Sequence, residues 1–245
     1  MKFAGIIAEY DPFHNGHAWQ LAQAKALGAE RVAVAMSCSL VQRGALPLLP
    51  EAVRTRSALT CGADLVFALP APCACAGAEA FARAGVALLA AAGCDGLVFG
   101  AETPDAALLM EAAELLDSGS YRAALKAQLA GGARSFAAAR QAAAAQLASD
   151  ERVAALLDKP NNNLAVEYCR AIRSLAPRME AYPLPRQGAN HGEALHSAHG
   201  QFASASALRK LWAEGGADAV APYVPEAVFP LYQEAYAAGQ YTDFS

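Results

Sequence analysis

The stretch that most constrains the fold of this chain is KFAGIIAEYDPFHNGHAWQL, residues 2–21. Its apolar run from Phe3 to Ala8 has the length of a buried strand, and the turn that follows contains Pro12, which fixes φ and ends strand pairing. A helical pattern then starts at the sequence H-N-G-H, residues 14–17. The order of strand, tight turn and helix start predicts a site where backbone N–H groups and the positive end of a helix dipole point at an anion.

The two histidines of this turn are the first candidate site residues. A spacing of three at a helix start places His14 and His17 on one face, so both rings can reach the same phosphate. Gly16 between them lets a ligand approach the backbone closely. Solvated or helix-capping histidines are the alternative, but the position directly after a first buried strand favours phosphate binding.

Further apolar runs predict the rest of the fold. The runs expected to form strands are residues 32–36, 65–69, 96–99 and 182–184. Helical patterns separate them, which indicates an α/β fold with a Rossmann-like, doubly wound parallel sheet followed by helical segments. In such sheets ligands bind beyond the carboxyl ends of the strands. His14, the pair Gln42-Arg43 and Gly100 all fall at those ends.

The domain organisation is predicted from changes in composition. We expect one Rossmann-like domain over residues 1–211, interrupted around 104–158 by an alanine-rich helical insert. Residues 212–245 are expected to begin a helical C-terminal region.

Composition excludes several classes of protein. The chain has 245 residues, of which 55% are hydrophobic and 17% charged, as in globular proteins that bury a full core. No apolar stretch reaches the roughly 20 residues of a membrane span, and no signal peptide is visible before the first strand. The six cysteines are scattered through apolar segments and are expected to be buried thiols in a reducing cytoplasm. Cys73 and Cys75 lack a matching pair, so no metal site is predicted.

The formal charge of −4 is unusual for a protein that binds nucleic acid, because polyanion binding usually requires a basic surface. The stretch from Arg170 to Lys210 carries six basic residues and is the expected basic region. A solvated helix face is the alternative interpretation.

A second motif lies near the end of this basic region. The motif is S-x-S-x-x-R, formed by Ser204, Ser206 and Arg209 at a predicted helix start. Serines at a helix start can cap the helix or donate hydrogen bonds to a phosphate. Arg209 lies one turn further along on the same side of the helix, where it can bind the same phosphate. The polar loop before it contains His191, His196 and His199. Their irregular spacing favours a mobile or phosphate-facing segment over a metal site.

The sequence GIIAEYDPFHNGH, residues 5–17, closely resembles the start of the bacterial tRNA(Met) cytidine acetate ligases, a branch of the H-x-G-H nucleotidyltransferases. S-x-S-x-x-R resembles the C-terminal signature of that superfamily. Further blocks resemble the family's M-S-G-x-x-x-Q-R-G loop, its G-x-D-L-V strand, its K-P-N-N motif and its R-x-G-A-x-x-H segment, and they occupy residues 36–44, 62–66, 159–162 and 186–191.

The resemblance implies a set of ATP-binding residues. They are Ile7, Ala8, Glu9, Tyr10, Asp11, Pro12, Phe13, His14, Asn15, Gly16, His17, Ala18, Trp19 and Gln20 of the first strand, turn and helix, together with Gly100, Asn161 or Asn162, and Arg186. His14 and His17 are expected to act on the triphosphate and its transition state, and Ser204, Ser206 and Arg209 on the departing pyrophosphate. Gln42 and Arg43 are expected substrate or tRNA contacts.

The implied reaction joins acetate to ATP, giving acetyl-adenylate, and passes the acetyl group to the wobble cytidine of elongator tRNA(Met). It implies ATP with Mg²⁺ on the triphosphate, acetate and tRNA as partners, a cytoplasmic location and no membrane. Catalysis of adenylation is mainly positioning and charge stabilisation, so no nucleophilic side chain is required. Two alternatives stay open: a small-molecule adenylyl- or cytidylyltransferase, and a non-catalytic nucleotide- or RNA-binding module.

Several positions depart from the family pattern. Family members continue well past the point where this sequence stops, so the resemblance implies either that the helical region beginning at residue 212 is truncated here or that this is a shortened homologue. The departures are Cys38 for a glycine, Glu51 for a lysine, Ala68 for an acidic residue, Ala101 for a serine and Asn163 for an aliphatic residue. The change at Glu51 removes a positive charge expected near phosphate or tRNA.

Overall fold

The computed structural model describes residues 1–186, 195–197 and 200–243. Its main sheet has the strand order β3-β2-β1-β4-β5, and all neighbouring strands pair in parallel. These strands are β1 (Phe3–Ala8), β2 (Arg31–Ser37), β3 (Leu65–Leu69), β4 (Gly96–Ala101) and β5 (Glu180–Pro185). The arrangement confirms the predicted doubly wound α/β fold. A short antiparallel pair, β6 (Leu195–Ser197) and β7 (Gly200–Phe202), lies outside this sheet.

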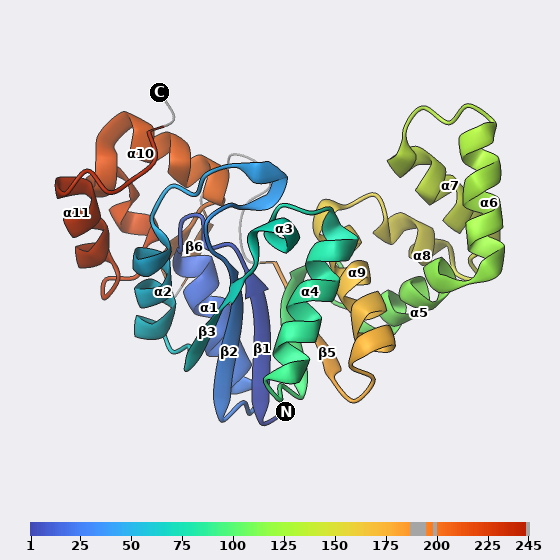
Figure 1. Cartoon of the computed structure of the whole chain (residues 1–245), viewed down its shortest axis with the longest axis horizontal. Helices are drawn as coiled ribbons and strands as arrows, with labels where there is room; N and C mark the ends of the chain where they lie inside the picture. The colour runs from blue at the N-terminus through green and yellow to red at the C-terminus, as the bar shows by residue number, and fades with distance from the viewer. Residues whose placement is uncertain (187–194, 198–199, 244–245) are drawn as a thin grey trace.

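Helices cover both faces of the sheet and extend beyond it (Figure 1). In chain order they are α1 (Asn15–Ala26), the 3-10 turn η1 (Gln42–Gly44), α2 (Glu51–Thr60), α3 (Ala71–Ala74), α4 (Ala78–Ala91), α5 (Ala106–Asp117), α6 (Gly119–Ala130), α7 (Phe136–Leu147), α8 (Glu151–Leu156), α9 (Pro160–Leu175), α10 (Ala205–Val220), the 3-10 turn η2 (Ala221–Tyr223) and α11 (Phe229–Ala237).

Strand β1 packs between two separate hydrophobic cores because its side chains alternate between the two faces of the sheet. Ala4 and Ile6 are fully buried in a core shared with α1, α2, α10 and α11. The other face meets α4 at very short range. A Cβ atom on Gly85 would lie 2.5 Å from Cδ1 of Ile7, so only glycine allows the helix to sit this close to the strand.

Strand β5 occupies one edge of the sheet and contains Pro183, which pairs with Phe99 of β4. Proline lacks a backbone N–H, so an edge is where a sheet tolerates it. The predicted strand at residues 182–184 is therefore confirmed, with two further residues at its start and one at its end.

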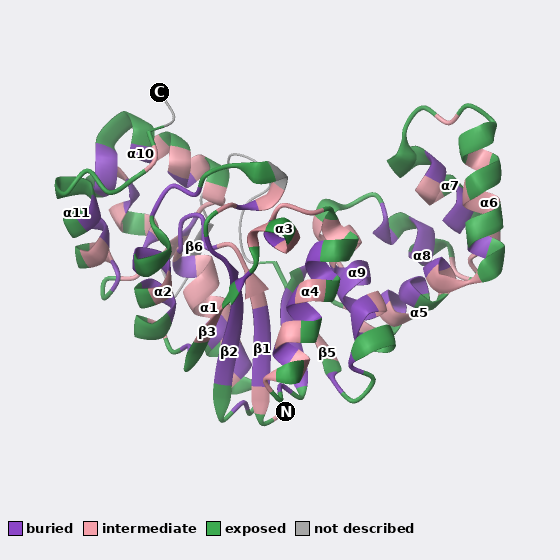
Figure 2. Cartoon of the chain, viewed as in Figure 1, coloured by how far each residue is buried: buried purple, intermediate pink, exposed green. Residues whose placement is uncertain are grey.

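The alanine-rich segment forms helices α5 to α8, which extend to one side of the sheet in Figure 1 and expose much of α6 in Figure 2. Glu167 of α9 anchors this arm, because its carboxylate is 1% exposed and accepts from Arg140 of α7 at 2.5 Å and from Arg170 at 2.7 Å. Arg170 also pairs with Asp117 of α5 at 2.7 Å, and Arg173 pairs with the same helix. The expected basic region is thus partly neutralised, and its first two arginines hold helices together.

Helices α10 and α11 pack onto the Rossmann-like core. The expected domain boundary between residues 211 and 212 falls within α10. Trp212 and Tyr232 are 3% and 0% exposed and belong to the same core as Phe13 of the β1–α1 turn, whose carbonyl accepts from the Tyr232 hydroxyl at 2.7 Å. One hydrophobic core therefore spans both sides of that boundary.

Some of the predicted site residues fall outside this description. His191 and His199 lie outside the described residues, and the structure does not describe the side chains of Arg43 and His196. Over the part of the chain that it does describe, no helix is long and apolar enough to cross a membrane.

Candidate functional site

The turn between β1 and α1 is held by its two histidines. His14 is the N-cap of α1, and its Nδ1 accepts from the backbone N–H of Gly16 at 3.0 Å. His17 reaches back with its own Nδ1 to the backbone N–H of His14 at 3.3 Å. These two bonds form a reciprocal capping box, which satisfies two N–H groups that a helix start otherwise leaves free.

This cap also fixes the chemical form of the rings. A nitrogen that accepts a hydrogen bond carries no proton, so the neutral ring carries its proton on Nε2. Burial, with a smaller contribution from Arg186, lowers the pKa of His14 to about 4. Burial, His14 and Arg186 lower the pKa of His17 well below its usual value. The rings stack with their centroids 3.8 Å apart. Near neutral pH the turn therefore presents two neutral Nε2–H donors side by side.

A cavity of about 220 Å³ opens at the carboxyl ends of β1, β4 and β5, next to these rings. It lies where the fold predicts a ligand. Its lining contains nine of the residues predicted to bind ATP: Ile7, His14, Gly16, His17, Trp19, Gln20, Gly100, Asn161 and Arg186. Phe99, Leu164, Tyr168, Leu184 and Pro185 complete it. The sequence therefore located most of the residues that meet at this cavity.

Other residues of the first turn do not line the cavity. Tyr10 and Phe13 are 1% and 0% exposed, and their rings pack against His17 with centroid distances of 4.8 Å and 5.6 Å. They support a cavity-lining ring from behind. Ala8, Pro12 and Ala18 are likewise absent from the lining.

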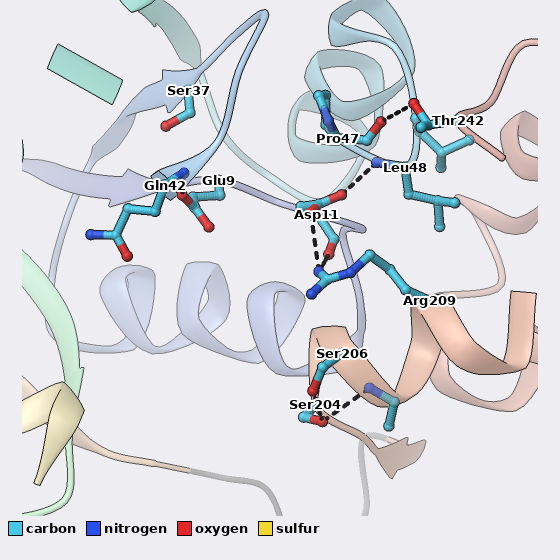
Figure 3. A network of polar contacts seen from close by, with 12 residues as sticks. Glu9, Asp11, Ser37, Gln42, Pro47, Leu48, Ser204, Ser206, Arg209 and Thr242 are labelled. Atoms are coloured by element: carbon cyan, nitrogen blue, oxygen red, sulfur yellow. Dashed lines mark hydrogen bonds and ion pairs between the residues drawn. The ribbon is translucent and has the colours of Figure 1, made fainter. Parts of the chain in front are cut away.

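Asp11 and Asn15 connect the turn to distant segments. Asp11 accepts from the backbone N–H of Leu48 at 2.6 Å and from Arg209 at 3.0 Å (Figure 3). Asn15 is 6% exposed, and its Nδ2 donates to the carbonyls of Gln201 and Pro222 at 3.0 Å and 3.2 Å. The side chains of Asp11 and Asn15, two residues of the predicted ATP-binding stretch, therefore form hydrogen bonds within the protein.

The S-x-S-x-x-R motif lies at the start of α10, outside the cavity lining. Ser204 is the N-cap and accepts from the backbone N–H of Ala207 at 3.2 Å, and its hydroxyl is 3.1 Å from that of Ser206 (Figure 3). Arg209 donates to Asp11 through Nη1 alone. Its Nε and Nη2 have no hydrogen-bond partner among the described residues, so the guanidinium retains donors for an anion.

Arg54 of α2 is a buried arginine that holds several loops together, and the sequence did not predict this role. It is 0% exposed, and it donates to the carbonyls of Glu9 at 2.7 Å, Ser37 at 2.6 Å and Leu49 at 2.9 Å, and also to that of Cys38. It therefore fixes the loops that follow β1 and β2. Nothing in the sequence EAVRTR distinguishes this arginine from Arg56 two residues later, which is exposed.

Glu9 and Gln42 meet between these two loops. Glu9 accepts from the backbone N–H of Gln42 at 2.6 Å through Oε1 (Figure 3). Burial raises the pKa of Glu9, and the Gln42 N–H opposes that change. Gln42, a predicted substrate contact, thus lies beside the end of β1 and outside the cavity lining.

The two asparagines of K-P-N-N differ in position. Asn161 lines the cavity, and its Nδ2 donates to Glu102 at 2.5 Å. Asn162 is 1% exposed and bonds to Thr103 through both its amide oxygen and its amide nitrogen, at 2.9 Å and 3.1 Å. Of the two alternatives, Asn161 is the one placed to meet a ligand. Across residues 1–186, 195–197 and 200–243, no group of three or more His, Cys, Asp or Glu residues could hold a metal ion.

Comparisons with known proteins identify relatives of this chain. A tRNA(Met) cytidine acetate ligase of Syntrophotalea carbinolica is 41% identical over 218 residues, covering 88% of this chain and 52% of its own length. One of Caldanaerobacter subterraneus subsp. tengcongensis is 35% identical over 244 residues, covering 98% and 60%. The crystal structure of Thermotoga maritima TmcAL bound with alpha-thio ATP matches with a TM-score of 0.88 at 30% identity, over 98% of this chain and 57% of that chain.

This chain therefore spans little more than half the length of the relatives that it matches. The model of the family described as HIGH Nucleotidyl Transferase matches residues 1–245 of this chain. The H-N-G-H turn, the parallel sheet and these matches together establish that the chain belongs to the HIGH Nucleotidyl Transferase family.

Proposed function

We propose that this chain carries the ATP-using part of a tRNA(Met) cytidine acetate ligase. The observation that carries the proposal is the pair of neutral Nε2–H donors of His14 and His17 beside a cavity at the carboxyl ends of the strands. Relatives with this name at 35–41% identity support the substrate class. The alpha-thio ATP of the Thermotoga maritima protein supports ATP as the nucleotide.

The first step needs no nucleophile from the protein. A carboxylate oxygen of acetate attacks the α-phosphorus of ATP, the bond to the bridging oxygen breaks, and pyrophosphate leaves with the electron pair. Negative charge accumulates on the phosphate oxygens in the transition state. Two fixed donors act on that charge without having to reorganise, and such donors typically accelerate a reaction about 10²–10³-fold each.

The α10 motif is assigned to the leaving group. Arg209 keeps its Nε and Nη2 free of partners in the described structure, and Ser206 lies at the same helix start. Mg²⁺ would be carried by the triphosphate rather than by a protein cluster, and it would neutralise part of the phosphate charge. Ser204 is used as a helix cap, so its contribution to phosphate binding would come from its hydroxyl proton.

The second step transfers the acetyl group. The exocyclic amine of the wobble cytidine in elongator tRNA(Met) attacks the acetyl carbon, AMP leaves, and the amine loses a proton. A tRNA substrate supports a cytoplasmic location for the enzyme. Gln42 and Arg43, in the loop after β2, are the proposed tRNA contacts within this chain.

The test is exchange of radiolabelled pyrophosphate into ATP, with and without acetate and without tRNA. Acetate-dependent exchange is expected for wild type and not for His14→Asn. Exchange that requires a phosphorylated metabolite instead of acetate would overturn the proposal in favour of a small-molecule nucleotidyltransferase. ATP binding without any exchange would show a non-catalytic module.

A further inference from the structure

The loop after β4 and the start of α9 are joined through Glu102. Its Oε1 accepts from the side-chain Nδ2 of Asn161 at 2.5 Å and from the backbone N–H of the same residue at 3.3 Å. Its Oε2 accepts from the backbone N–H of Asn162 at 2.7 Å. One exposed carboxylate thus caps α9 and holds the side chain of a cavity-lining residue.

This contact decides which way the Asn161 amide faces. A carboxylate only accepts hydrogen bonds, so the atom of Asn161 next to Glu102 must be the amide nitrogen. The amide oxygen has no partner among the described residues and is left as the acceptor available to the cavity. The neighbouring Asn162 is tied to Thr103 by two hydrogen bonds, which keeps the helix start from shifting.

The cavity lining contains two chemically different groups of residues. His14, His17 and Arg186 are polar or charged and suit a triphosphate, whereas Leu164 and Tyr168 offer α9 side chains that suit a flat ring. Asn161 lies one turn before Leu164 on the same helix. A nucleobase packed against Leu164 and Tyr168 would lie within reach of the Asn161 amide.

We infer that Glu102 is a positioning residue that makes this site select adenine over guanine, by holding Asn161 with its amide oxygen toward the base. Adenine carries an amino group, a donor, at the position where guanine carries a carbonyl, an acceptor. An oxygen fixed in place bonds the first and repels the second. The inference rests on the proposed use of ATP and adds to it a reason for choosing that nucleotide.

The side-chain amide of Gln20 also lines the cavity and is the competing explanation for selectivity between adenine and guanine. Gln20 donates through Nε2 to the carbonyl of Val98 at 3.1 Å, and among the described residues its oxygen has no partner. In the described part of the chain, no hydrogen bond joins Glu102 to Gln20. A change at Glu102 therefore separates the two amides.

The experiment measures dissociation constants for ATP and for GTP by calorimetry, each with Mg²⁺ and without acetate or tRNA. Wild type is expected to prefer ATP by about tenfold or more, the effect of one well-placed hydrogen bond replaced by a repulsive contact. Glu102→Ala frees the Asn161 amide to rotate and is expected to bring the two constants to within about threefold. Asn161→Ala should give the same ratio as Glu102→Ala.

Thr103→Ala is the matched control, because it removes a hydrogen bond from the same junction and leaves the contact between Glu102 and Asn161 in place. It should keep the wild-type ratio, and thermal melts confirm that each variant is folded. An unchanged ratio in Glu102→Ala would overturn the inference and assign selectivity to Gln20. Equal binding of both nucleotides by wild type would also overturn it, whereas selective ATP binding without acetate-dependent exchange would support it and defeat the proposed function.

Discussion

The carboxylate of Asp11 and the guanidinium of Arg209 are 3.0 Å apart although 198 residues separate them in the sequence. Nη1 of Arg209 also donates to the main-chain carbonyl of Asp11 at 2.7 Å. The other carboxylate oxygen of Asp11 accepts from Leu48, in the loop after β2. The β1–α1 turn, the loop after β2 and helix α10 therefore meet at one side chain that is 7% exposed.

Replacing Asp11 by alanine should lower the free energy of unfolding by about 2–4 kcal/mol. The change removes the anionic partner of a partly buried guanidinium, which keeps only the main-chain carbonyl of residue 11, and the acceptor of the buried Leu48 N–H. Removing one partner of a buried ion pair is costly. Urea denaturation measures the loss. Arg56→Ala is the control, because its pair with Glu234 spans 3.9 Å between side chains that are 63% and 70% exposed, so less than about 1 kcal/mol is expected. Equal losses in the two variants would contradict the structural role of Asp11.

The variants His14→Asn and His17→Gln separate catalysis from helix capping. Asparagine is a good N-cap, and glutamine at the third helical position completes a capping box, so both should keep a melting temperature close to that of wild type. Each removes an Nε2–H donor, and acetate-dependent pyrophosphate exchange is expected to fall about 100-fold or more. Alanine at either position should lower both activity and stability. Full activity in His14→Asn would show that its ring serves the cap alone.

Stability should decrease as the pH falls through the range from about 6.5 to about 4. The folded protein depresses the pKa of His14 from 6.5 to about 4, and that of His17 in the same direction, so in this range the unfolded chain binds protons that the folded chain excludes. The contribution of the two neutral histidines to the free energy of unfolding is fully present above pH 6.5. It is lost as the pH falls below that value, with a slope of at most about 1.4 kcal/mol per pH unit for each histidine. Urea denaturation at several pH values should show a flatter profile for the double variant His14→Asn/His17→Gln. Parallel profiles would contradict this assignment.

Gly85→Ala should destabilise the protein by about 1–3 kcal/mol, because the new methyl group would overlap Ile7 across the contact between α4 and β1. The double variant with Ile7→Ala gives that methyl group room, so a coupling energy of about 1 kcal/mol or more is expected in a double-mutant cycle. Gly119→Ala is the control, since a Cβ atom added there would have no atom within 4 Å, and it should not destabilise. Additive effects at positions 7 and 85 would mean that the two elements adjust without strain.

The sheet could be predicted because each of its strands is an apolar run between turn residues. Phe3–Ala8 and Leu65–Leu69 have the predicted bounds, and the other three strands extend one or more residues beyond theirs. The strands of a buried parallel sheet appear in a sequence as short apolar runs, so the local sequence was sufficient to locate them. The position of the cavity then followed from the strand ends.

Local sequence did not predict which residues of the β1–α1 turn line the cavity and which support it from behind. Tyr10, Phe13, Asp11 and Asn15 lie in one motif with the histidines, yet they face the core or distant segments. Which side of a tight turn each residue faces depends on what α10 and α11 place against it, and no local pattern encodes that packing. Local sequence likewise offers no way to choose between Asn161 and Asn162, since the choice depends on Glu102 and Thr103.

Arg54 has a consequence for which positions of this chain are open to change. Its partners, residues 9, 37, 38 and 49, all contribute main-chain carbonyls, which are present whatever side chain the residue carries. Cys38 therefore accepts its bond from Arg54 as a glycine at this position would. Substitutions at these four positions therefore leave the acceptors of Arg54 in place, whereas no other side chain has the same five donors as arginine.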